Sequence, residues 1–166
     1  TQLANFSHNT GFLAACIDII SNDSVQPIVK QSCSIYFKNI ILKNWTIGNL
    51  LDNDERPIIR ERLLQSIIKL DRILRNQLLP ALSLIVKYDN PSNWPELMEH
   101  IMNLINASSE SGDFNSLYVG IYSFAEICRN YRWKQNKERS SNLDPIIVNC
   151  FPSVLSIGTI FMNDAK

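Results

Sequence analysis

Apolar side chains recur at helical spacing along most of this 166-residue chain. Between residues 12 and 21 they share one face, as in an amphipathic helix, at Leu13, Cys16, Ile17 and Ile20. The same period predicts helices over residues 25–43, 55–70, 71–88, 95–105, 114–133 and 144–162, and a helix tail over residues 3–8. No stretch alternates between apolar and polar residues as a half-buried strand does. The predicted fold class is therefore all-α.

Two of these helices differ in the width of their apolar face. The helix over residues 25–43 carries a broad stripe that includes Ile28 and Val29, which is typical of a helix packed on both sides. The helix over residues 55–70 has a narrower face, whose predicted core positions are Ile59, Leu63, Ile67 and Leu70. Both patterns indicate a helix that is stabilised by packing against other helices.

Residues 85–97, IVKYDNPSNWPEL, predict a helix end, a loop and a helix start. Asp89 and Asn90 end the first helix, because short polar side chains bond nearby backbone groups and compete with the helix. Pro91 cannot continue that helix. Pro95 lies in the first turn of the next helix, where proline is tolerated. The stretch predicts a helical hairpin with a defined corner.

Two tryptophans lie in predicted loops. Trp94 is expected to pack between helices rather than to contact a ligand, because large aromatic surfaces are usually buried. Trp45 is expected to pack in the same way against the second helix pair. Ser92 or Asn93 is predicted to cap the helix that follows Trp94.

Polar and glycine-containing stretches are predicted to separate the later helices. Residues 106–113 are expected to form a Ser/Gly/Asp linker, and residues 135–142 a polar loop. Pro80 is expected to kink its helix, because proline cannot donate to the carbonyl one turn earlier. Gly120 is expected to permit close contact with another helix.

Helix pairs recur at a regular interval. They begin near Val25, Asp71 and Gly112, which is a period of about forty to forty-five residues. HEAT and armadillo repeats have this length, and their hairpins stack into a solenoid. The chain opens on Thr1 within a predicted helix end, so we expect it to be a piece of a longer protein.

Composition excludes several classes of protein. Hydrophobic residues make up 45% of the chain, which excludes intrinsic disorder. The 16 basic and 16 acidic residues balance, which argues against a domain that binds nucleic acid over its whole surface. No apolar run is long enough to span a membrane. Four cysteines are scattered singly and are predicted to be buried free thiols in a reducing compartment: Cys16, Cys33, Cys128 and Cys150.

No cluster of residues predicts catalysis or metal binding. His8 and His100 are the only histidines, and no metal-ligand spacing joins them. The acidic residues Asp52, Asp54 and Glu55 are better explained as charges that favour a helix N-terminus than as a catalytic pair. We therefore expect no enzymatic activity, no metal and no cofactor.

One basic stretch is a candidate for nucleic-acid binding. Residues 129–139 interleave basic side chains with the aromatic residues Tyr131 and Trp133, and single-strand binders combine cations and stacking aromatics in this way. The basic residues are Arg129, Arg132, Lys134, Lys137 and Arg139. The favoured interpretation is a basic helix C-terminus, stabilised by the helix dipole, followed by a solvated loop.

Five motifs occur in order over nearly the full chain. They are VKQSCSIYFKN at residues 29–39, followed by Trp45, then ERPIIRERLL at 55–64, RNQL at 75–78, DNPSNWPEL at 89–97 and YSFAEICRNY at 122–131. Together they resemble the importin-beta superfamily of nuclear transport receptors, and their spacing is most similar to the branch of importins seven and eight. Two features depart from the family: Asn90 stands where members often carry an aromatic residue, and the opening helix is cut short.

The resemblance implies a right-handed α-solenoid of HEAT repeats with about four helical hairpins, the first incomplete. Residues 1–166 would be an N-terminal segment of a longer nuclear transport receptor. It would bind the GTP form of the GTPase Ran and help carry protein cargo through nuclear pores into the nucleus. FG-repeat nucleoporins would be further partners, whereas nucleic acid and membranes would not, and the protein would shuttle between cytoplasm and nucleus. Two alternatives stay open: a HEAT-repeat scaffold, and an export receptor of the same superfamily.

The family also implies where Ran would bind. Its N-terminal hairpins bind Ran through their inner helices, which correspond here to residues 12–21, 55–70, 95–105 and the last helix. The polar residues expected to contact Ran are Asp18, Arg62, Gln65, Lys69, Glu96, Glu99 and Asn103. The alternative for each is an ordinary solvated position.

The remaining motif residues are predicted to be structural. They are Lys38, Asn39, Trp45, Asp89, Pro91, Trp94 and Pro95. Asn39 is expected to hydrogen-bond a neighbouring repeat, because a buried amide must find partners. Contact of Lys38 and Asn39 with a partner protein is the alternative.

Overall fold

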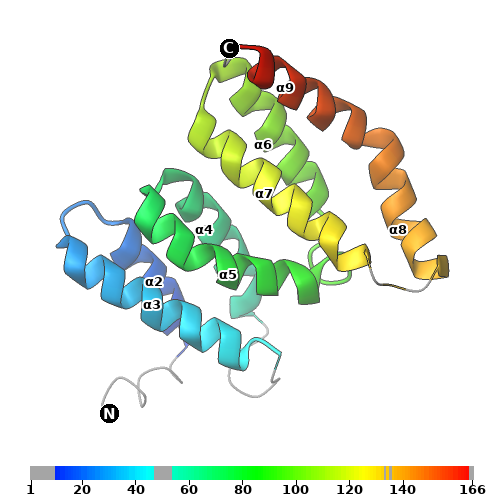
Figure 1. Cartoon of the computed structure of the whole chain (residues 1–166). Coiled ribbons are helices and arrows are strands. Elements are labelled where there is room, and N and C mark those ends of the chain that lie inside the picture. The colour runs from blue at the N-terminus through cyan, green and yellow to red at the C-terminus, as the bar shows by residue number, and fades with distance from the viewer. Residues whose placement is uncertain (1–9, 47–53, 133, 135, 165–166) are drawn as a thin grey trace. The chain divides into compact units, whose positions relative to one another are not determined.

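The computed structural model describes residues 10–46, 54–132, 134 and 136–164. Within them the chain forms eight α-helices and no strand, which confirms the all-α prediction (Figure 1). The helices are α2 (Phe12–Ser21), α3 (Pro27–Asn44), α4 (Glu55–Lys69), α5 (Arg72–Asp89), α6 (Leu97–Ser111), α7 (Phe114–Tyr131), α8 (Asn136–Asn149) and α9 (Phe151–Asp164). The predicted helix tail over residues 3–8 and most of the loop after Trp45 lie outside the described residues.

The chain divides into two compact units, Thr1–Tyr88 and Asp89–Lys166. In the first unit, α2 packs against both α3 and α4. The core is aliphatic and aromatic, with fully buried Ile17, Ile20, Phe37, Ile41, Ile59, Leu63 and Ile67. The core positions predicted for α2 and α4 are therefore confirmed. α5 continues through Pro80 as one helix, and Asp71 caps it by accepting hydrogen bonds from the backbone N–H groups of Ile73 and Leu74.

The apolar stripe of α3 is narrower in the structure than predicted. Its buried residues are Ser34, Phe37 and Ile41, whereas Ile28 is 65% exposed and Val29 46% exposed. The three buried residues lie on one helical face, which is what a helix packed on a single side requires. The prediction that the start of α3 is packed on both sides was wrong.

Glu55 has a different role from the one predicted. Instead of an exposed charge at the start of α4, it is a buried carboxylate that accepts a hydrogen bond from the backbone N–H of Gly11. Gly11 is the N-cap residue of α2 and has a left-handed φ of 85°. Glu55 therefore joins the starts of two neighbouring helices, and its charge is favourable at both N-termini.

In the second unit, α6 and α7 lie side by side and form its central hairpin (Figure 1). Gly112, with a left-handed φ of 73°, ends α6, and Asp113 caps α7 by accepting hydrogen bonds from the N–H groups of Asn115 and Ser116. A Cβ atom at Gly120 would lie 2.7 Å from Cγ1 of Ile105, so the predicted close helix contact at Gly120 is confirmed.

The predicted linker over residues 106–113 was wrong, because α6 continues to Ser111. Ser108 is 3% exposed, and its hydroxyl donates to the carbonyl of Leu104 one turn earlier. The hydroxyl of Ser111 likewise donates to the carbonyl of Ser108. These bonds satisfy the serine hydroxyls within the helix, and packing against α7 outweighs the weak helix propensity of serine.

The C-terminal helices also differ from the prediction. Residues 136–142 belong to α8 rather than to a loop, and the single helix predicted over residues 144–162 is two helices with a turn at Cys150. Pro152 explains the break, because its ring would clash with a carbonyl of the preceding turn of a continuous helix. Among the described residues, no single helix has the length and apolar composition needed to cross a membrane; α8 and α9 meet that test only as a pair bent by 43°.

Candidate protein-binding surfaces

Four of the predicted Ran-contacting residues lie on α2 and α4 in the first unit. Nη1 of Arg62 on α4 lies 3.1 Å from both carboxylate oxygens of Asp18 on α2. Both side chains are exposed, 46% for Arg62 and 67% for Asp18. A second contact joins the same helices, because the Ser21 hydroxyl lies 3.0 Å from the Ser66 hydroxyl. The structure thus brings Asp18 and Arg62 together on one solvent-facing surface, which we call the α2–α4 surface.

The other two residues extend this surface along α4. Gln65 and Lys69 follow Arg62 at intervals of three and four residues, so all three share one helical face. Both are exposed, and the amide of Gln65 donates to Glu61, 3.2 Å away. The α2–α4 surface therefore carries one compensated ion pair with a further cation and an amide beside it.

Three predicted contact residues lie on α6 in the second unit. Glu96 is the N-cap residue of α6, and Glu99 and Asn103 follow on the same face. All three are exposed. Near the other end of α6, the hydroxyl of Ser153 on α9 donates to Asn106, 3.3 Å away. This exposed polar face is acidic at its N-terminal end.

The side-chain amide of Asn90 holds the loop after α5 in place. Asn90 donates from its amide nitrogen to the carbonyl of Trp94, 3.2 Å away, and accepts at Oδ1 from the Tyr131 hydroxyl, also 3.2 Å away. The carbonyl of Asp89 accepts from the N–H groups of Asn93 and Trp94. The sequence predicted that Asn90 helps to end α5 and departs from the family pattern, but it did not predict these two hydrogen bonds.

The motif residues in this loop agree in part with the predictions. α5 ends at Asp89, which is 2% exposed, and Trp94 is 6% exposed, so the predicted helix end and buried indole are confirmed. The Asn90–Pro91 peptide bond is cis. The predicted cap at Ser92 or Asn93 was wrong, because α6 begins at Leu97, after Pro95, and its N-cap is Glu96.

We expect Asn90→Ala to lower the free energy of unfolding by about 1–2 kcal/mol, because it removes both hydrogen bonds of the amide. Urea denaturation followed by far-UV circular dichroism measures this. Ser92→Ala, an exposed change in the same loop, should shift stability by less than about 0.5 kcal/mol. If the two variants are equally stable, Asn90 does not hold the loop.

Two motif residues of α3 have different environments. Lys38 donates to Gln77 on α5, with 3.3 Å between Nζ and Oε1, so it links α3 to the next hairpin. Asn39 is exposed, and the prediction that it is a buried amide was wrong. Trp45 is 1% exposed and the Arg56 guanidinium carbon lies 5.0 Å from its ring centre, which confirms the predicted packing against the second helix pair.

The four cysteines are free thiols, but only Cys16 is fully buried. Cys33 donates to the carbonyl of Cys16 with 3.6 Å between sulfur and oxygen. A hydrogen bond between the two thiols raises the pKa of Cys16 and lowers the pKa of Cys33. Burial raises the pKa of both Cys128 and Cys150. Cys33 should therefore ionise at the lowest pH of the four.

Trp133 of the basic stretch lies outside the described residues, and the described aromatic residue, Tyr131, offers no exposed ring for stacking. Tyr131 is 4% exposed and its hydroxyl is engaged with Asn90. Arg129 lies in the last turn of α7, as expected for a basic helix C-terminus. The expected solvated loop is short, because α8 begins at Asn136.

The paired helices and their exposed polar faces define the chain as a segment of a HEAT-type helical repeat protein. Residues 1–69 match the model of the importin-beta N-terminal domain. Through these residues the chain belongs to the importin-beta family, and relatives that align with most of its length are named importins and exportins.

Named relatives cover nearly the full chain. It is 37% identical over 185 aligned positions to the Saccharomyces cerevisiae protein called nonsense-mediated mRNA decay protein 5, covering 100% of the chain and 17% of that protein. It is 29% identical to importin-8 of Danio rerio, over 93% of the chain and 16% of the relative. It is 26% identical to exportin-2 of Pongo abelii, over 84% of the chain and 15% of the relative. The chain thus spans a small part of the length of these relatives.

Proposed function

We propose that this chain is an N-terminal segment of a nuclear transport receptor and that it binds the GTP form of Ran through the α2–α4 surface. The exposed face of α6, with Glu96, Glu99 and Asn103, would provide a second contact. The observation that carries the proposal is the exposed pairing of Asp18 with Arg62 across two helices. The family match over residues 1–69 includes both of these helices, which supports the choice of surface.

The charges of this surface suit a protein partner. Arg62 and Lys69 present two cations about two helical turns apart, and Asp18 orients the first of them with two hydrogen bonds. Charged groups held in this way contribute mainly to specificity and association rate. An acidic and polar patch on the partner would complement them.

The decisive experiment is a titration of this chain against Ran loaded with a non-hydrolysable GTP analogue, with the GDP form alongside. We expect preferential binding of the GTP form. Arg62→Glu should weaken that binding by at least about tenfold, because it removes a cation and places two carboxylates side by side. Equal binding of the two forms, or none, would favour the HEAT-scaffold alternative.

A matched control separates local contact from general charge. Arg72→Glu makes the same charge change at an exposed residue at the start of α5, outside the α2–α4 surface. It should leave Ran affinity within about twofold of the parent, because a distant surface charge is screened by salt. If both variants lose affinity equally, the α2–α4 surface is not the contact.

We also propose import as the direction of transport, with protein cargo as partner and shuttling between cytoplasm and nucleus. Matches to proteins named importin and exportin keep export as the alternative. The two directions differ in the sign of one coupling: Ran-GTP would weaken cargo binding to an import receptor and strengthen it for an export receptor. Docking of FG-repeat nucleoporins is supported by exposed apolar side chains on α3, α5 and α7, namely Ile28, Ile73, Phe114 and Tyr118.

A further inference from the structure

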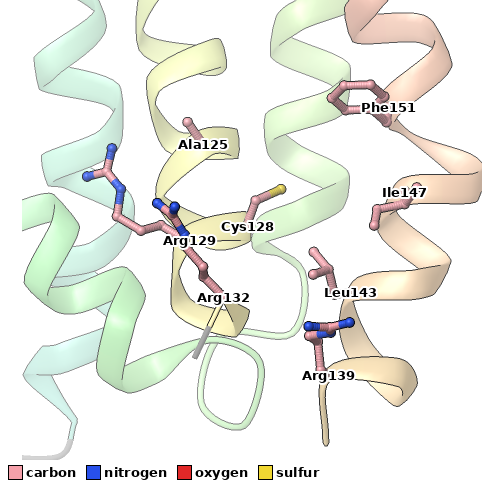
Figure 2. Close-up of a pocket in the computed structure, with 8 residues that line it drawn as sticks. All are labelled: Ala125, Cys128, Arg129, Arg132, Arg139, Leu143, Ile147 and Phe151. Atoms are coloured by element: carbon pink, nitrogen blue, oxygen red, sulfur yellow. The ribbon is translucent and has the colours of Figure 1, made fainter. Parts of the chain in front are cut away.

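A cavity of about 380 Å³ opens beside α7 and α8 in the second unit. Its lining comes from the second half of α7, from α8 and from the first residue of α9, and consists of Ala125, Cys128, Arg129, Arg132, Arg139, Leu143, Ile147 and Phe151. Cys128, Leu143 and Ile147 point toward the space between α7 and α8 (Figure 2). The volume falls within the range of about 300–1,000 Å³ that is usual for ligand pockets.

The lining combines an apolar surface with positively charged arginines. Ile147 is 48% exposed and Phe151 is 47% exposed, so apolar surface stays in contact with water inside a hollow. Three of the eight lining residues are arginines, and none of these eight described residues is acidic. One of these arginines is already paired, because the carboxylate of Glu126 lies 2.5 Å from Nη1 of Arg129.

Helix stability does not explain all of this positive charge. Arg129 and Arg132 lie at the C-terminal end of α7, where the helix dipole favours cations. Arg139 lies in the first turn of α8, where the dipole disfavours a cation. In Figure 2 the side chains of Arg129 and Arg132 extend from α7 away from α8, whereas Arg139 lies beside Leu143, so an anion bound there would be attracted mainly by the Arg139 guanidinium.

We propose that this pocket binds an acidic peptide segment with one apolar side chain. The apolar side chain would contact Leu143, Ile147 and Phe151, and a flanking carboxylate would pair with Arg139. Burial of the half-exposed apolar groups would add to the charge pairing. Single-stranded RNA is the weaker occupant, because Tyr131 is buried and Phe151 is the one aromatic ring in the described lining. The proposal uses none of the residues of the α2–α4 surface and does not depend on Ran binding.

The test is a fluorescence-anisotropy titration of the full chain with a labelled peptide in which a central phenylalanine is flanked by aspartates. Two control peptides replace the aspartates with asparagines or the phenylalanine with serine, and an oligouridine of similar length tests RNA. We expect the acidic apolar peptide to bind at least about tenfold more tightly than either control peptide. Equal affinity for all three peptides, no binding, or preferential RNA binding would overturn the proposal.

Two pairs of residues that are close in sequence provide matched variants. Arg139→Glu should weaken peptide binding about tenfold, whereas Lys137→Glu, the same charge change at an exposed residue outside the lining, should not. Ile147→Asp should abolish binding, whereas Val148→Asp, at a 70% exposed position outside the lining, should not. Equal losses within either pair would show that the peptide binds by general charge or elsewhere.

A second readout locates the peptide independently of mutation. Cys128 lines the pocket, whereas Cys33 belongs to the other unit. Saturating peptide should slow alkylation of Cys128 several-fold and leave the rate at Cys33 unchanged, as measured by mass spectrometry of the digested protein. Unchanged alkylation of Cys128 under saturation would place the peptide outside this pocket.

Discussion

Trp45→Ala is expected to lower the free energy of unfolding by about 3–5 kcal/mol, the range for removal of a large buried aromatic side chain. The indole is 1% exposed, and Arg56 lies over its ring at 5.0 Å. The substitution leaves a cavity that the surrounding helices can fill only in part, and it removes the stacking partner of Arg56. Because domains of this size are stabilised by only about 5–15 kcal/mol, the loss is a large share of the total.

Urea denaturation followed by far-UV circular dichroism measures this effect. Ile28→Ala on the same helix is the control, because Ile28 is 65% exposed and its truncation should cost less than about 0.5 kcal/mol. A Trp45→Ala variant as stable as the Ile28→Ala variant would contradict the assigned packing of the indole.

Gly120→Val is expected to destabilise the second unit by about 1–3 kcal/mol through overpacking. A Cβ atom at this position would lie 2.7 Å from Cγ1 of Ile105 and 3.6 Å from its backbone nitrogen. The Ile105 side chain is fully buried, so α6 and α7 must separate or adopt strained rotamers to admit the valine. The loss should appear as a lower urea midpoint.

The matched control is Gly158→Val in α9. Gly158 is also a helical glycine, but a Cβ atom there has no neighbour within 4 Å. It should leave stability unchanged or slightly raised, because valine has a better helix propensity than glycine. Equal destabilisation by both substitutions would show that the effect comes from the helix itself and not from contact between α6 and α7.

Several helix boundaries depended on packing that local sequence does not contain. Serines weaken helices in isolation, which favoured a linker over residues 106–113, yet Ser108 is buried and bonded within α6. The polar residues at the start of α8 likewise predicted a loop. In both cases the neighbouring helix supplies the stabilisation that propensity lacks.

In the candidate binding surfaces, too, the sequence predicted the exposure of single residues but not the contacts between them. Exposure of Asp18 and Arg62 was predictable from their places opposite the apolar faces of two helices. Their pairing was not, because 44 residues separate them in the chain. The pocket beside α7 and α8 also combines residues from three helices, and the sequence showed only the basic stretch that contributes its arginines.

The sequence by itself determined the all-α class, the period of the helix pairs, the core face of α4 and the family motifs, because apolar spacing and proline or glycine breaks act locally along the chain. The tertiary structure alone decided that Glu55 bonds the start of α2, that Asn90 joins Trp94 to Tyr131, and that residues of α7, α8 and α9 line one pocket. These contacts join residues far apart in the chain, so they arise from how the helices pack and not from the period of any one of them.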